Sequence, residues 1–204
     1  MPDKEKDTEY KIKEAARKVF QEKGFAATKT RDIAEAANIN LALLNYYFRS
    51  KKKLFNIIMT ETLRSFFSGV VIVLNDESTT LKEKVTSVAS HYIDMLSENQ
   101  NVATFILNAV RENPEEFISN MGMLEKAKAS IFMQQFQEGV QKGEIPTINP
   151  VHFMLNLMGM IVFPFIAQPM VSAISGIAKE DFIRIIQERK RLIPLWIASM
   201  LSVA

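Results

Sequence analysis

Residues 24–54 read GFAATKTRDIAEAANINLALLNYYFRSKKKL. In this stretch apolar residues recur at helical spacing on both sides of Asn38-Ile39-Asn40, which predicts two short helices joined by a tight turn. Asparagine tolerates the left-handed backbone that such a turn needs, and Asn40 is also a good N-cap for a second helix over residues 41–48. Thr28 or Thr30 is expected to cap the first helix. The stretch is therefore typical of a helix-turn-helix.

Amphipathic helices are predicted on either side of this motif. The apolar residues of 8–24 recur at helical spacing, and Gly24 suits the left-handed position just past a helix end. Ser50 is a good N-cap for a further helix that leads out of the N-terminal unit. The chain is therefore expected to begin with a three-helix domain at residues 1–50, with its helix-turn-helix motif at about residues 29–48.

The rest of the chain, residues 51–204, is predicted to be helical as well. Thr80 and Glu83 form a capping box, and Asn149-Pro150 matches an N-cap followed by proline at the first helical position. No strand-like alternation is sustained in the sequence, so the predicted fold class is all-α. The helix-turn-helix domain is then followed by a larger helical domain. Its later helices are expected at residues 81–97, 102–111, 115–142 and 179–202.

The composition excludes several classes of protein. The 204 residues include no Cys and only two His, and they lack the nucleophile elbow, phosphate-binding loop and HExxH spacing of common enzyme classes. The chain is thus predicted not to be an enzyme and to bind no metal or cofactor. Its N-terminal segment alternates charges without an apolar stretch, which does not resemble a secretion signal, and a cytoplasmic location is expected.

Positive charge is concentrated at the front of the chain. Residues 1–60 hold 13 Lys and Arg against 8 Asp and Glu, whereas the remainder holds 12 against 15. This asymmetry fits a polyanion as the partner of the N-terminal domain, although an ordinary solvated surface gives the same count. Charge alone leaves both interpretations open.

The region from Ile145 to Ala178 contains no Asp, Glu, Lys or Arg. A membrane-spanning helix needs about 20 apolar residues, so a helical lipid-binding or membrane-attached interaction protein is the alternative function. Asn156, Gln168 and the prolines of this region argue against a span. Together with the apolar helix over residues 179–202, the region instead predicts a homodimer that buries both C-terminal helices, with no membrane as a partner.

The second helix of a helix-turn-helix enters the major groove of DNA while the first braces it across the backbone. At about 100° per residue, this helix turns Leu41, Leu44 and Phe48 toward its own domain. It turns Ala42 and Tyr46 toward solvent, with Leu43 and Asn45 beside them. Polar and apolar groups on such a face read base edges, and hydroxyl and basic groups reach phosphates. The candidate DNA-binding residues are Thr30, Arg31, Asn40, Ala42, Leu43, Asn45, Tyr46, Tyr47 and Lys51.

Several of these candidates also have a purely structural interpretation. Asn45 is the strongest candidate for reading a base, because asparagine pairs in bidentate fashion with adenine. Lys51 lies at a helix N-terminus, which favours a phosphate. Tyr47 can instead pack on its own domain, and Asn40 can serve only as a cap. The exposure of Leu43 depends on the rotational phase of its helix.

An ordered set of residues in this region carries a resemblance to a known family: Gly24-Phe25, Thr28, Arg31-Asp32-Ile33-Ala34, Ala36-Ala37, Asn40, Leu44, Tyr46-Tyr47-Phe48, Ser50-Lys51 and Leu54. The set resembles the signature of the TetR family of transcriptional regulators. The resemblance implies a homodimer that binds a palindromic operator, usually represses transcription, and releases DNA when a small ligand enters the C-terminal domain. Leu41, Leu43 and Asn45 depart from the family's commonest residues, so no operator sequence is carried over.

A ligand in the C-terminal domain is expected to meet apolar walls, because Phe and Met side chains are abundant after Ser65. The same side chains fill a protein core equally well. Polar groups within these helices can orient a hydrophobic or amphipathic effector or simply bond to the backbone. The candidates are His91, Tyr92, Asn108 and Gln134.

Overall fold

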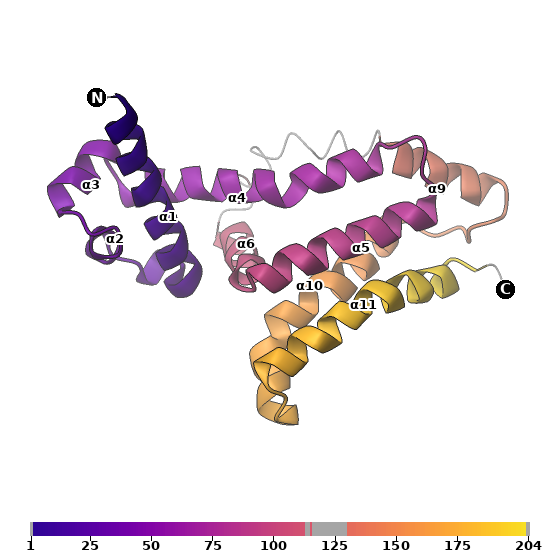
Figure 1. Cartoon of the computed structure of the whole chain (residues 1–204). Helices are drawn as coiled ribbons and strands as arrows, with labels where there is room; N and C mark the ends of the chain where they lie inside the picture. The colour runs from indigo at the N-terminus through magenta and orange to yellow at the C-terminus, as the bar shows by residue number, and fades with distance from the viewer. Residues whose placement is uncertain (1, 113–114, 116–129, 203–204) are drawn as a thin grey trace. The chain divides into compact units, whose positions relative to one another are not determined.

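The computed structural model describes residues 2–112, 115 and 130–202, and every regular element within them is a helix (Figure 1). The predicted all-α class is confirmed. The chain forms two compact units. The first unit consists of the described residues of Met1–Ser65 and Thr104–Asn120. The second consists of the described residues of Phe66–Ala103 and Met121–Ala204. The expected domain division at residue 50 stays a prediction, since compactness does not test which residues bind DNA.

The first unit contains α1 (Pro2–Ala27), α2 (Thr30–Ala36) and α3 (Leu41–Tyr47), together with the start of α4 (Lys51–Leu74) and most of α6 (Asn101–Glu112). Helix α1 begins at Pro2, before the predicted Thr8, and proline suits a first helical position because its fixed φ is helical. The backbone leaves the helical region at Gly24, where φ is 73°, as its position in the sequence predicts. A short helical segment follows it.

Buried apolar side chains from these helices form the core of the first unit. They include Ile12, Ala16, Val19, Phe20, Ile33, Leu44, Phe48, Leu54 and Ile58.

The N-cap of α2 is Lys29, and the carboxylate of Asp32 accepts its backbone N–H at 2.9 Å. The expectation that Thr28 or Thr30 caps this helix is therefore wrong. Thr28 is buried and its hydroxyl donates instead to the carbonyl of Gly24 at 2.6 Å, which closes the end of α1.

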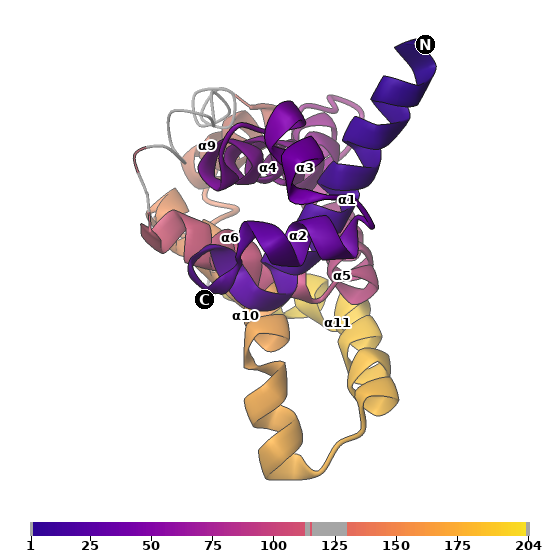
Figure 2. The same ribbon diagram turned by 90° about the vertical axis from the view of Figure 1, so that its left-hand side faces the viewer.

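The second unit is built on α5 (Leu81–Glu98), which packs against α9 (Ile131–Gln141), α10 (Pro150–Ser175) and α11 (Lys179–Met200). Helices α10 and α11 form a hairpin with a short connection (Figure 2). The predicted capping box of α5 is confirmed, because the backbone N–H of Thr80 donates to Glu83 at 2.8 Å and the Thr80 hydroxyl accepts in return.

One predicted helix boundary is wrong. A single helix was expected over residues 115–142, but α9 begins after Ser130, whose extended backbone and side-chain oxygen form an N-cap for the N–H of Met133. Residues 116–129 lie outside the described residues. At the next helix the prediction is confirmed, since Asn149 accepts the N–H of Val151 at 2.9 Å and Pro150 occupies the first turn.

Helix α10 carries many exposed apolar side chains, and Pro164 and Pro169 lie inside it. In the described part of the chain, α4 and α10 are the helices long and apolar enough to cross a membrane by length and composition alone. Such helices also occur in the cores and interfaces of soluble proteins. Length and apolar composition therefore do not by themselves decide between a homodimer interface and a membrane-attached or lipid-binding protein.

Candidate nucleic-acid interface

The turn between α2 and α3 has the geometry that its sequence predicts. Asn38 adopts the left-handed conformation, with a φ of 53°, and the N–H of Ile39 donates to the carbonyl of Ala34 at 3.0 Å. The side-chain oxygen of Asn40 then accepts the N–H of Leu43 at 2.8 Å. These bonds fix the point at which α3 begins. The cap uses the side-chain oxygen of Asn40, which is an exposed residue.

Helix α3 is anchored by its inner face and presents its outer face to solvent. Leu44 is 1% exposed and Phe48 5% exposed, so the predicted inner face is confirmed at both positions, whereas Leu41 is only half-buried. Asn45 is exposed, and Tyr46 is 73% exposed with its ring 5.3 Å from that of Tyr47 in an edge-to-face arrangement. A large aromatic side chain and an amide are thus held outward on a short, well-capped helix.

The remaining candidates on α2 and α3 are divided between the surface and the domain. Ala42 and Arg31 are exposed, whereas Thr30, Leu43 and Tyr47 are half-buried. The exposed groups are free to contact a partner, and the half-buried ones also pack on their own unit. The rotational phase of α3 therefore favours Asn45 over Leu43 as the group that reaches a base.

Lys51 makes contacts that the sequence did not indicate. Its ammonium donates to the carbonyls of Phe25 and Thr28, both at 2.8 Å, and lies 4.3 Å from the centre of the Phe25 ring. Two of its three N–H donors are thus used within the domain. Lys51 ties the start of α4 to the chain between α1 and α2.

Two basic residues next to the helix-turn-helix were missed by the sequence reasoning. Lys29 precedes α2 and Arg49 follows α3, and both side chains are exposed. Among the described residues, no ion pair engages either of them. The signal that could have identified them is their positive charge at the ends of the two short helices of the motif.

An acidic residue also helps to fix the front of α2. The carboxylate of Asp32 bonds to the backbone of Lys29 and lies 3.3 Å from the ammonium of Lys23. The backbone hydrogen bond from Lys29 is the main reason that the pKa of Asp32 lies below its usual value, and the Lys23 charge adds to it against a smaller opposing effect of desolvation. Asp32 is therefore ionised whenever the domain is folded near neutral pH.

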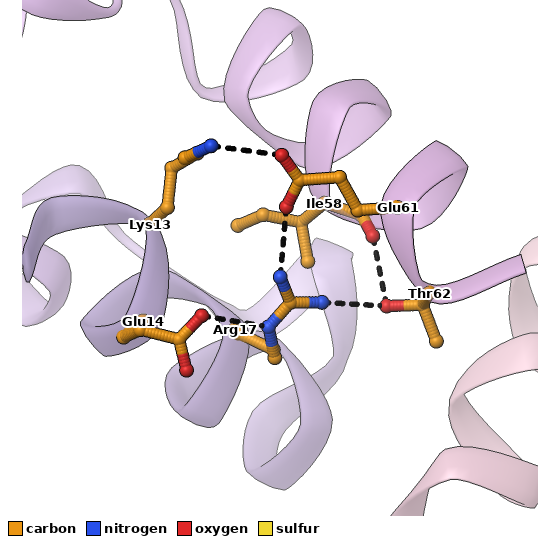
Figure 3. Close-up of polar contacts among 6 residues, drawn as sticks. All are labelled: Lys13, Glu14, Arg17, Ile58, Glu61 and Thr62. Carbon is orange, nitrogen blue, oxygen red and sulfur yellow. Dashed lines mark hydrogen bonds and ion pairs between the residues drawn. The ribbon is translucent and has the colours of Figure 1, made fainter. Parts of the chain in front are cut away.

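A polar network joins α1 to α4 within the first unit (Figure 3). Both oxygens of Glu61 are used, since Lys13 and Arg17 each donate to one of them at 2.8 Å. Arg17 also donates to the hydroxyl of Thr62 at 2.9 Å, and that hydroxyl donates to the carbonyl of Ile58. Burial works to raise the pKa of Glu61, but the hydrogen bonds and charges of Lys13 and Arg17 outweigh it and lower that pKa.

Replacing Glu61 with Gln is expected to lower the free energy of unfolding by about 0.5–1 kcal/mol at neutral pH, because the network is partly exposed and screened. Since the folded-state pKa lies below the ordinary 4.5, the contribution is complete above 4.5 and is lost as the pH falls through the lowered value. Urea unfolding at several pH values measures this difference. Glu14→Gln is the matched control, as its exposed pair with Arg17 should matter less. A difference that grows on acidification would contradict the assignment.

Comparison with known proteins identifies a family to which the N-terminal part of the chain is similar. Residues 12–58, which run from α1 into α4, match the family model described as "Bacterial regulatory proteins, tetR family". The chain is also 26% identical over 171 residues to the "Probable HTH-type transcriptional regulator YttP" of Bacillus subtilis (strain 168), covering 82% of this chain and 81% of that protein. The chain belongs to the TetR family. It is a DNA-binding transcriptional regulator of TetR type, as the sequence resemblance implies.

Solved structures of TetR-family regulators share this fold over the full length. A TetR family transcription regulator from Marinobacter aquaeolei VT8 is 16% identical, with a TM-score of 0.68 and 100% of each chain covered. HlyIIR, a hemolysin II transcriptional regulator, is 21% identical, with a TM-score of 0.56 and coverage of 98% of this chain and 99% of that chain. At these identities the likeness concerns the fold alone.

The four effector-binding candidates in this TetR-family chain differ in burial and belong to different units, and they stay predictions. Tyr92 is 1% exposed, and burial raises the pKa of its hydroxyl. His91 and Gln134 are exposed, and so is Asn108, which belongs to the first unit. The residue next to Gln134 is the one turned inward, because the Gln135 amide donates to the carbonyl of Thr79 at 2.8 Å. Among the described buried side-chain polar atoms, the Gln135 oxygen lacks a partner.

Proposed function

We propose that this TetR-family regulator is a cytoplasmic repressor that binds a palindromic operator as a homodimer and is released by a small hydrophobic ligand. The observation that supports it most directly is the outer face of α3, where Asn45 and Tyr46 are exposed on a helix whose inner face is buried. Residues 1–50 are proposed as the DNA-binding domain and residues 51–204 as the effector-binding and dimerisation domain. No catalytic role is proposed.

The DNA contacts are divided into base readers and phosphate anchors. Asn45 is proposed to read a base edge in the major groove, because it is exposed and its amide suits adenine. Lys29 and Arg49 are proposed as anchors on the phosphates. The full proposed interface contains Lys29, Thr30, Arg31, Asn40, Ala42, Leu43, Asn45, Tyr46, Tyr47, Arg49 and Lys51.

Homodimerisation through α10 and α11 is proposed because both helices leave large apolar side chains exposed in one copy. Such a surface favours self-association, and two copies related by a two-fold axis match the two halves of a palindrome. The exposed side chains are Val151, Met154, Leu155, Phe163, Met170, Ile174, Ile185, Leu195 and Trp196.

Selection of bound fragments from genomic DNA tests this function. A palindromic sequence should be recovered, and its half-sites should lie about one helical turn apart or a multiple of it. Sedimentation of the same preparation tests the alternative of a membrane-attached or lipid-binding protein, which is favoured by the apolar helix α10. A protein that pellets without detergent and recovers no common sequence would support that alternative.

Replacing Asn45 with Ala is expected to weaken the preference at one base pair of each half-site by about 1–3 kcal/mol, because a bidentate pair is lost. Replacing Arg49 with Ala should instead weaken binding to all sequences alike. Competition binding with single-position operator variants measures both effects. If the two variants lose the same preferences, the division into readers and anchors is incorrect.

A further inference from the structure

Helix α6 contributes a buried aromatic side chain to the first unit, although it lies far from the helix-turn-helix in sequence. Phe105 is 4% exposed, and its ring lies 5.6 Å from that of Phe55 on α4 in an edge-to-face arrangement. The residues of α6 from Thr104 onward belong to the first unit. The unit that holds the helix-turn-helix therefore takes part of its core from a later segment of the chain.

Phe55 joins Phe105 to the end of α1. The Phe55 ring lies 4.8 Å from that of Phe25 and 5.1 Å from that of Phe20. Phe20 is fully buried, whereas Phe25 and Phe55 are half-buried. Aromatic rings at these separations stabilise one another beyond the effect of the area that they bury. The Phe55 ring thus supports the Phe25 ring, and the Phe105 ring supports that of Phe55.

The Phe25 ring in turn lies beneath a cation at the start of α4. The Lys51 ammonium is 4.3 Å from the centre of this ring and donates to the carbonyls of Phe25 and Thr28. Thr28 directly precedes Lys29, the N-cap of α2. Lys51 is one of the proposed DNA contacts, and a lysine already held in one conformation loses less side-chain freedom on meeting a phosphate. A shift of Phe25 would therefore disturb both this cation and the segment that leads into α2.

We propose that Phe105 is a positioning residue for operator binding, which acts through Phe55 and Phe25 on Lys51. Its own side chain is buried and so does not contact DNA. Truncating it leaves a cavity behind Phe55, and a close-packed cluster relaxes toward such a cavity. The proposal rests on the proposed DNA-binding function and gives it a residue that lies outside residues 1–50.

Lysine labelling of the full-length chain without DNA tests the effect on Lys51. Trace acetic anhydride is added, and tandem mass spectrometry compares Lys51 with the adjacent Lys52, which is exposed. In the parent, Lys51 should react several-fold more slowly because its two hydrogen bonds must first break. In Phe105→Ala the two rates should approach each other, at a temperature where circular dichroism shows the variant folded. Phe136→Ala is the matched control, since Phe136 is equally buried but lies in the second unit, and its ratio should equal the parent's.

A double-mutant cycle on operator binding tests the effect on DNA. Phe105→Ala is expected to weaken binding about tenfold and to reduce the slope of affinity against salt by about two for a dimer, because both copies of Lys51 lose their position. In a Lys51→Ala background the same change should have little further effect, since the group through which it acts is gone. A merely structural role would instead weaken binding equally in both backgrounds and leave the salt slope unchanged.

Either of those structural results, or a labelling ratio that stays at the parent's value, would overturn the proposal. If Phe105→Ala does not fold, Phe105→Leu takes its place with a smaller cavity, and its labelling ratio and salt slope should lie between those of the parent and full release of Lys51. Values equal to the parent's would then overturn the proposal. The labelling needs no DNA, so it separates failure of this proposal from failure of the proposed function.

Discussion

Replacing Leu44 with Ala is expected to lower the free energy of unfolding of the first unit by about 2–5 kcal/mol and to abolish operator binding. Helix α3 spans only Leu41–Tyr47, and Leu44 is its fully buried side chain. The truncated side chain leaves a cavity against the core and removes the anchor that holds the outer face in place. Urea unfolding measures the first effect, and operator binding at a temperature where the variant is folded measures the second.

Leu43→Ala is the matched control for this prediction. The chemical change is the same and the residue is adjacent, but Leu43 is only half-buried. The free energy of unfolding of this variant should fall by about 1 kcal/mol or less. Its operator preference should change at no more than one thymine, whose methyl group Leu43 could contact. If both variants lose equal stability, the rotational phase of α3 described above is wrong.

Operator affinity is expected to fall by about 10³–10⁵ between about 50 and 200 mM salt, because phosphate contacts by basic side chains release counterions. Lys29, Arg31 and Arg49 are exposed around the helix-turn-helix, and a dimer brings two sets of them to the DNA. Equilibrium titrations at several salt concentrations give the slope of affinity against salt.

Arg49→Ala should reduce that slope by about two for a dimer, roughly one for each phosphate contact removed. Lys142→Ala is the control, because Lys142 is exposed in the second unit and paired with Glu138 at 3.5 Å. Its slope should match that of the parent. Binding that is insensitive to salt would count against phosphate anchoring by these residues.

The helix-turn-helix was predictable because its signals are local. Asn38 and Asn40 mark the turn and the cap by their own chemistry, and the spacing of Leu44 and Phe48 sets the phase of α3. The same reasoning could not tell which glutamine of α9 turns inward: Gln134 is exposed, whereas Gln135 donates to the carbonyl of Thr79, because a shift of one position turns a helical side chain by about 100°. Lys51 was assigned by position alone, and its actual partners on Phe25 and Thr28 are distant in sequence.

The sequence by itself determined the all-α class, the positions of the turn and the caps, and the family, because each depends on residues within a few positions of one another. Tertiary structure alone decided the contacts between distant segments. It brought Glu61 to Lys13 and Arg17, and Phe105 to Phe55. Such pairs join residues that are far apart along the chain, and only packing of the helices makes them neighbours.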